Sequence, residues 1–285
     1  MLNHTRVNKD SPDFCNRSTV RSGERIRLRL INTANARVFG LQFENHAPWR
    51  IAIDGHPVQP SKIDNDLVIL PPGGRTDLII DFNGKPGDEF VIKDLYYGRQ
   101  QYILTKCLYE DAKPVRSKPL GMPEKLADNP VKEPDLGNAI RHEMVFEGGA
   151  MGGLRQAELN GEVLGLRELA GRGLVWAVNG KMYPPIEKDN IGESMLSMKL
   201  GKTYILKWTN QTAFDHPIHM HGHSFHVLSH NGKRLETPVI MDTVLIHPDQ
   251  SAEVAFVADN PGKWALHCHV LEHAAAGMMG YVEVT

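Results

Sequence analysis

The sequence repeats itself, and this repeat constrains the fold more than any other feature of the chain. Residues 22–32 match residues 200–210 in position and pattern, and residues 72–80 match residues 248–256. The first of these segments alternates charged and apolar residues over Glu24–Asn32, which is typical of a half-buried β-strand. The simplest account is one β-domain present in two copies.

Short strand patterns, separated by turn residues rich in Gly, Pro and Asn, follow an irregular start over residues 1–20. In the first half we predict strands at Glu24–Asn32, Val38–Phe43, Trp49–Ile53, Leu67–Leu70, Thr76–Phe82, Glu89–Lys93 and Tyr102–Leu108. Residues 148–173 are rich in Gly and Leu and predict a loop or short-helix insertion, and the strand pattern resumes at Leu196 and runs to Val284. No long amphipathic helix is evident, so we predict an all-β chain of sandwich or barrel type.

A change of composition separates the two copies. Residues 111–137 contain five prolines among Lys, Asp and Glu, which disfavours a core strand and indicates a linker on the surface. We therefore predict a first domain over residues 1–112, a linker over residues 113–140 and a second domain over residues 141–285.

Composition excludes several classes of partner. The formal net charge is −2, which gives no reason to expect a nucleic acid or a membrane surface. No apolar run approaches the roughly 18 residues that a membrane span needs. The first residues have neither a basic nor an apolar region, so no signal peptide is predicted. Cys15 and Cys107 could form a disulfide or remain two buried thiols.

Ten of the fourteen histidines lie between His216 and His273, in two clusters. The first reads His-Pro-Ile-His-Met-His-Gly-His from His216. The second is a cysteine between two histidines, followed by a third histidine and a methionine. Thiolate, imidazole and thioether together are the ligand set of a copper electron-transfer site.

Strand geometry divides these candidates between two sites. His267 and His269 leave one side of a strand, and Cys268 between them leaves the other. The group predicted inside the sandwich is His216, Cys268, His273 and Met278. The group predicted on an outer surface, where further copper would bind, is His219, His221, His267 and His269. An electron at the Cys268 sulfur would have a short covalent route to either flanking histidine.

The ligands occur only in the second copy. In the alignment of the two halves, His216, His219 and His221 fall opposite Val38, Leu41 and Phe43, and residues 267–269 fall opposite residues 92–94. Structural zinc would favour several thiolates or paired cysteines. A nucleophilic serine elbow and a Gly-rich phosphate loop are both missing from the sequence.

The histidines outside the two groups are assigned to structure. An ordinary structural role is predicted for His4, His46, His56, His142, His230 and His247. His223 and His226 either orient ligands or occupy ordinary core or edge positions. Asp242 could contact a substrate, but a structural hydrogen-bonding role is favoured.

The two histidine clusters resemble the C-terminal signatures of the multicopper oxidases, the laccase-like family. The first half resembles the copper-free middle domain of a three-domain member, so the resemblance implies two cupredoxin-like Greek-key domains. It implies type 1 copper at His216, Cys268, His273 and Met278. It implies type 2 copper at His219, and the type 3 pair at His221, His267 and His269. It also implies one-electron oxidation of phenols, aromatic amines or metal ions at type 1 copper, with reduction of dioxygen to water, in the periplasm or outside the cell.

The chain departs from this family in two ways. The trinuclear cluster of the family needs eight histidines, and the half supplied by an N-terminal domain has no counterpart before His216. Ala274–Ala276 occupy the place where many bacterial members carry an acidic proton relay. Two hypotheses follow. The chain is either most of an oxidase that needs a missing domain or partner subunit, or a copper-binding electron-transfer module without oxygen reduction.

Overall fold

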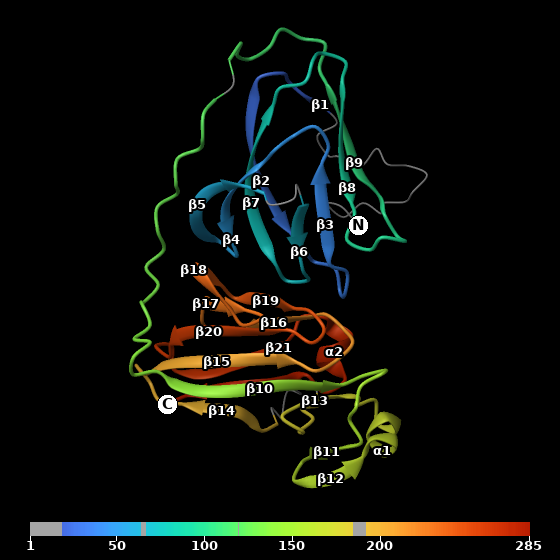
Figure 1. The fold of residues 1–285 in the computed structure, drawn as a ribbon, viewed down its shortest axis with the longest axis vertical. Helices are drawn as coiled ribbons and strands as arrows, with labels where there is room; N and C mark the ends of the chain where they lie inside the picture. Colours follow the sequence, from blue (N-terminus) through green and yellow to red (C-terminus); the bar gives the residue numbers. More distant parts are fainter. Residues whose placement is uncertain (1–18, 64–66, 119, 185–191) are drawn as a thin grey trace. The chain divides into compact units, whose positions relative to one another are not determined.

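The computed structural model describes residues 19–63, 67–118, 120–184 and 192–285, and it is almost entirely β-structure (Figure 1). The predicted all-β sandwich class is confirmed. The chain divides into two compact units. The first comprises residues up to Asn32 together with Val38–Asn129, and the second comprises Thr33–Arg37 and Pro130–Thr285. The assignment of these units as a copper-free and a copper-binding domain stays a prediction.

The first unit is built from two sheets. One has the strand order β1-β9-β8-β3-β6 and the other β2-β7-β4-β5. The strands are β1 Thr19–Val20, β2 Glu24–Ile31, β3 Phe39–Phe43, β4 Trp49–Ile53, β5 His56–Lys62, β6 Leu67–Leu70, β7 Arg75–Phe82, β8 Glu89–Asp94 and β9 Tyr102–Tyr109. Alternate side chains of both sheets, such as Phe43 and Leu78, form one buried core.

The second unit repeats this plan, with six strands instead of four in one of its two sheets. One sheet has the order β13-β10-β15-β20-β17-β18 and the other β14-β22-β21-β16-β19. The strands are β10 Ile140–Gly148, β13 Trp176–Val178, β14 Ser194–Met198, β15 Thr203–Asn210, β16 His216–Met220, β17 Phe225–His230, β18 Lys233–Met241, β19 Thr243–Ile246, β20 Ser251–Val257, β21 Gly262–Cys268 and β22 Met279–Val284. A short helix, α2 (Leu271–Ala275), joins β21 to β22.

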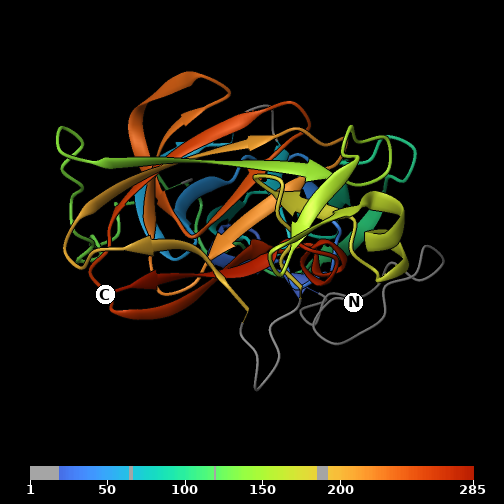
Figure 2. The ribbon, with the colours of Figure 1, turned by 90° about the horizontal axis from the view of Figure 1, so that it is seen from below.

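The insertion predicted near residue 160 forms a small module of its own. It contains the hairpin β11 (Gln156–Leu159) and β12 (Glu162–Gly165), followed by the helix α1 (Leu166–Gly171). Leucine side chains, including the fully buried Leu169, form its separate core. The short helix was predicted and the hairpin was not. In both views α1 and α2 lie at the same end of the second unit (Figure 2).

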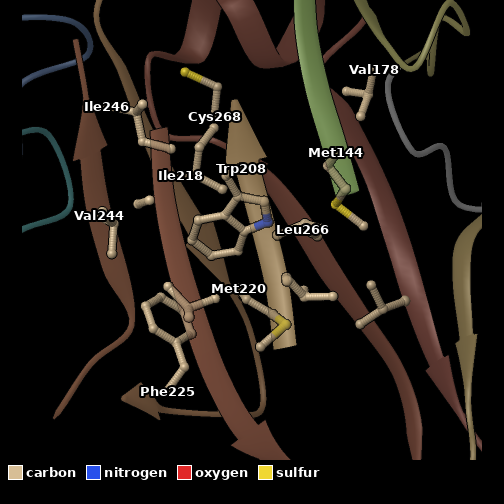
Figure 3. Close-up of a cluster of buried hydrophobic side chains, with 14 of the residues drawn as sticks. Met144, Val178, Trp208, Ile218, Met220, Phe225, Val244, Ile246, Leu266 and Cys268 are labelled. Atoms are coloured by element: carbon tan, nitrogen blue, oxygen red, sulfur yellow. The ribbon is translucent and has the colours of Figure 1, made fainter. Parts of the chain in front are cut away.

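The core of the second unit carries Cys268 at one end. Trp208 is fully buried at its centre, and its ring meets Phe225 at a centroid distance of 5.3 Å. Cys268 lies beyond Ile218 and Trp208 in the same cluster (Figure 3). Packing of this kind holds a side chain in one place, because a close-packed interior leaves little room for movement. Cys268 therefore sits on a rigid support.

Cys15 lies outside the described residues, so its pairing with the buried Cys107 stays a prediction. Among the residues that the structure describes, no helix is both long and apolar enough to cross a membrane.

Candidate metal centre

The two histidine clusters of the sequence meet on neighbouring strands. β16 lies between β19 and β21 in its sheet. The register places Ile218 opposite Cys268 and His219 opposite His267. Because neighbouring residues of a strand face opposite sides of the sheet, the adjacent residues His267 and Cys268 can serve two different groups.

The first group surrounds the Cys268 thiol. Its Sγ lies 3.5 Å from Nδ1 of His216 and 3.6 Å from Nδ1 of His273, and these two nitrogens are 3.2 Å apart. His216 begins β16, Cys268 ends β21, and His273 stands on α2. The thiol is 1% exposed and His216 is fully buried, whereas His273 is only partly buried.

Met278 lies three residues after the end of α2, the helix that carries His273. Its carbonyl accepts a hydrogen bond from the N–H of Cys268 at 3.1 Å, and its own N–H donates to the carbonyl of His273 at 3.2 Å. The Met278 side chain is buried and lines the same small cavity as Cys268. The structure thus brings the four residues predicted for the inner site to one end of the core.

Burial sets the protonation state of these side chains. It lowers the pKa of His216 to about 3, with a further contribution from His273, and it lowers the pKa of His273 to about 4. It raises the pKa of the Cys268 thiol well above its ordinary value. At neutral pH both imidazoles are neutral and able to bind a metal, whereas the thiol keeps its proton until a cation displaces it.

The spacing of this group fits a single metal ion. Ligand atoms about 2.0–2.3 Å from one ion, in tetrahedral or trigonal geometry, lie roughly 3.2–3.8 Å from one another. The three separations among His216, Cys268 and His273 fall within that range. Two imidazoles, a thiolate and a thioether favour copper over zinc, because a trigonal His₂Cys site with a weak axial methionine is typical of copper electron transfer.

The second group gathers the four histidines predicted for the outer surface. Nε2 of His221 and Nε2 of His267 are 3.1 Å apart. The ring centroid of His219 lies 4.7 Å from that of His221 and 5.6 Å from that of His267. The ring of His269 lies 5.6 Å from His267 and 5.7 Å from His219. Each of the four rings therefore contacts at least two of the others.

Backbone carbonyls orient two of these rings. Nδ1 of His219 lies 2.8 Å from the carbonyl of Asp242, and Nδ1 of His267 lies 2.9 Å from the carbonyl of Cys268. When Nδ1 donates in this way, the lone pair of Nε2 is left for a metal ion. Burial also lowers the pKa of His267 to about 4. The carboxylate of Asp242 accepts a hydrogen bond from the hydroxyl of Thr243 at 2.8 Å, and the choice between a structural role and substrate contact stays a prediction.

One residue at the first group was missed by sequence reasoning. The indole of Trp176 packs on the rings of His273 and His216, at centroid distances of 4.4 and 5.1 Å. In the sequence it is one apolar residue in a strand-like run, and nothing in its spacing from the histidines marks it. By contrast His223, for which two roles were open, packs on the rings of Phe256 and Trp264 within the core.

The sheet registers correct the alignment of the two halves by one residue. β3 and β16 occupy equivalent positions in their sheets, and Gln42 pairs with Lys93 as His219 pairs with His267. His219 therefore corresponds to Gln42 and not to Leu41. The loop before β3, counted from the matched asparagine, is one residue longer than the loop before β16, and the sequence alignment did not allow for this difference.

The corrected alignment shows what the first unit has at each ligand position. Lys93 and Glu44, equivalent to His267 and His221, form an ion pair at 2.7 Å. The buried Asp94, equivalent to Cys268, accepts hydrogen bonds from two backbone N–H groups at 3.0 and 3.2 Å. Among the described residues, both close groups of metal-ligating side chains belong to the second unit.

Comparison with known proteins identifies the family. Two family models, both described as multicopper oxidase, match residues 2–102 and residues 173–285. The chain belongs to the multicopper oxidase family. Membership supports copper as the metal and oxidoreductase as the class of protein.

The similarity covers nearly all of this chain and about half of each relative. The multicopper oxidase MmcO of Mycobacterium tuberculosis is 27% identical over 90% of this chain and 45% of its own length. A laccase of Neurospora crassa is 27% identical over 90% of this chain and 46% of its own. The crystal structure of a multicopper oxidase from Pseudomonas parafulva matches with a TM-score of 0.71 and 29% identity, over 94% of this chain and 58% of the other.

Proposed function

We propose that this chain is the copper-binding part of a laccase-type oxidase. The proposed type 1 ligands are His216, Cys268, His273 and the weaker Met278. The proposed type 2 ligand is His219, and the proposed type 3 ligands are His221, His267 and His269. Bound copper would supply one-electron oxidation at the first site and reduction of dioxygen to water at the second.

The protein's own residues define a route for the electron. His273 is partly exposed whereas His216 is fully buried, so with copper bound the electron of a donor would enter at the His273 edge. Cys268 is bonded through the backbone to His267, and the Cys268 carbonyl accepts a hydrogen bond from that ring at 2.9 Å. One covalent segment therefore joins the two groups. The donor would be a phenol, an aromatic amine or a low-valent metal ion, and the acceptor dioxygen.

A single observation carries this proposal: the buried thiol of Cys268 lies within 3.6 Å of two neutral imidazoles. A lone buried cysteine or histidine is usually structural. Here three such groups come together, with their ligand atoms 3.2–3.6 Å apart. A shared metal ion requires this arrangement, whereas packing alone does not.

The alternative function is copper binding and electron transfer without oxygen reduction. It is favoured by the second group, which has four histidines where the family's cluster uses eight, and by the chain spanning about half the length of its relatives. Full turnover would require the missing ligands from a further N-terminal domain or a partner subunit. We place the whole enzyme in the periplasm or outside the cell, as the family resemblance implies.

One preparation tests both functions. The protein is loaded with copper, its visible and electron paramagnetic resonance spectra are recorded, and oxygen uptake is measured with a phenolic donor. An intense blue band without oxygen uptake supports the alternative function, and oxygen uptake by this chain alone contradicts the proposal that half of the cluster is missing. Cys268→Ser removes the thiolate, so a variant that kept the blue band would overturn the type 1 assignment. Cys107→Ser is the matched control and should keep the band.

A further inference from the structure

A hydroxyl group stands behind the fully buried ligand His216. Nδ1 of His216 faces Cys268, and on the far side of the ring Nε2 lies 2.8 Å from Oγ1 of Thr212. Thr212 is 3% exposed, and Asn210, to which its hydroxyl is hydrogen-bonded, is fully buried. We infer that Thr212 is a positioning residue that fixes the ring of His216 and raises its basicity toward copper. This inference rests on the proposed copper role of His216.

The partners of the Thr212 hydroxyl determine which atom donates in each of its hydrogen bonds. Its Oγ1 lies 2.8 Å from Oδ1 of Asn210 and 3.3 Å from the carbonyl oxygen of Phe214. Both of these oxygens can only accept, so the single hydroxyl hydrogen goes to one of them and not to the ring of His216. The N–H of Phe214 donates to the same Oγ1 at 3.2 Å. Nε2 of His216 must then donate as well, which leaves the lone pair on Nδ1, the atom that faces the thiol.

Asn210 in turn has no freedom to move. Its Oδ1 accepts from both N–H and hydroxyl of Thr212, and its Nδ2 donates to the carbonyls of Phe214 and Ile246 at 2.7 and 3.0 Å. A fully satisfied buried network is rigid, because each alternative arrangement leaves a polar group without a partner. The orientation of the His216 ring is therefore tied to the strand framework through Thr212.

The duplicated scaffold provides an internal comparison. Asn32, equivalent to Asn210, donates to the carbonyl of Leu70 at 2.9 Å, as Asn210 does to the equivalent Ile246. The asparagine thus belongs to the scaffold of both units. Two residues further on, the first half of the chain has Ala34, and its counterpart of His216 is Phe39. The hydroxyl is present where an imidazole needs an acceptor and missing where a phenyl ring replaces it.

Three variants of the full chain test the inference. For each, potentiometric titration of the blue band gives the reduction potential, and competition gives the affinity for copper(II). Thr212→Val keeps the shape and removes the acceptor. Partners of metal-binding histidines typically contribute 10–100-fold to metal affinity. We expect Thr212→Val to weaken copper(II) binding at least tenfold with copper(I) little affected, which raises the reduction potential by about 59 mV or more for one electron. Thr212→Ser should restore both values.

Thr76→Val is the matched control, because it removes another buried threonine hydroxyl, which donates a hydrogen bond to the carbonyl of Ala52 at 3.0 Å in the first unit. It should cost stability and leave the potential unchanged. A Thr212→Val potential equal to that of the unsubstituted protein, or a Ser variant that behaves as Val does, would overturn the inference.

A copper-free measurement separates this inference from the proposed function. Nitrogen-15 NMR of the histidine rings in the unsubstituted protein should show His216 with its proton on Nε2. A proton on Nδ1 would contradict the role of Thr212 whether or not the protein binds copper. A blue band that never forms, together with an Nε2 proton, would instead refute only the type 1 site.

Discussion

Metal binding at Cys268 should release one proton per ion at pH 7. The pKa values of His216 and His273 are about 3 and about 4, so fewer than roughly one imidazole in a thousand is protonated at neutral pH. The Cys268 thiol has its pKa raised by burial and is fully protonated. The thiolate is the form that binds metal, so its proton must leave when an ion enters. The apparent affinity should therefore rise about tenfold per pH unit between pH 5 and 8.

Zinc is a suitable probe, because it takes the same ligand types without redox chemistry. Calorimetry in two buffers of different ionisation enthalpy gives the number of protons released at each pH. An ion bound by His267 displaces no proton from that ring, since its pKa is about 4. Cys268→Ser should reduce the release to near zero. A release near zero in the unsubstituted protein would mean a preformed thiolate, and a release of two would mean a charged imidazole; either result refutes the protonation states derived above.

Three further predictions concern stability and packing. The metal-free protein should lose stability as the pH falls from about 6.5 toward 3, because the pKa of His216 is lower in the folded protein than in the unfolded chain, which therefore binds the proton first. In urea denaturation, the free energy of unfolding should change by about 1.4 kcal/mol per pH unit from this residue. Gly149→Ala should reduce stability by at least about 1 kcal/mol and alter the copper spectrum, because Gly149 has a φ of 73° and an added Cβ would lie 2.1 Å from the indole of Trp176. Gly153→Ala is the matched control, because no atom lies within 4 Å of a Cβ added there. Equal melting temperatures for the two variants would contradict this account. Lys93→Met should cost less than about 1 kcal/mol in thermal denaturation, since the Lys93 side chain is 32% exposed and its ion pair is screened by solvent; a larger loss would show that the pair is structurally essential.

Local patterns in the sequence predicted most strands of the first unit, because charge alternation and turn residues act over a few positions. Seven strands were predicted to within one residue at each end. β5 was missed because Pro57 and Pro60 lie within it, and prolines are tolerated there since β5 is the edge strand of its sheet. β11 and β12 were missed because the surrounding glycines resemble a loop, and their hairpin gains its stability from α1 and the small core it shares.

At the candidate site, too, the local sequence predicted some features and not others. The spacing of His267, Cys268 and His273 predicted which residues would face one another, because ligand chemistry restricts the residue types. The partners that orient them could not be predicted in this way. Thr212 and the carbonyl of Asp242 contribute through the path of the backbone, and a threonine or a carbonyl carries no signature of the ring it faces.

The two units fill the predicted ligand positions in different ways on the same scaffold. Where the second unit has His221 and His267 across two strands, the first has Glu44 and Lys93, which also attract each other across the strands. Where the second has the buried Cys268, the first has a carboxylate held by two backbone N–H groups. Each replacement supplies a different interaction at the equivalent position, so the first unit keeps the same scaffold without these ligands. We therefore predict that the strands of the second unit form before copper binds.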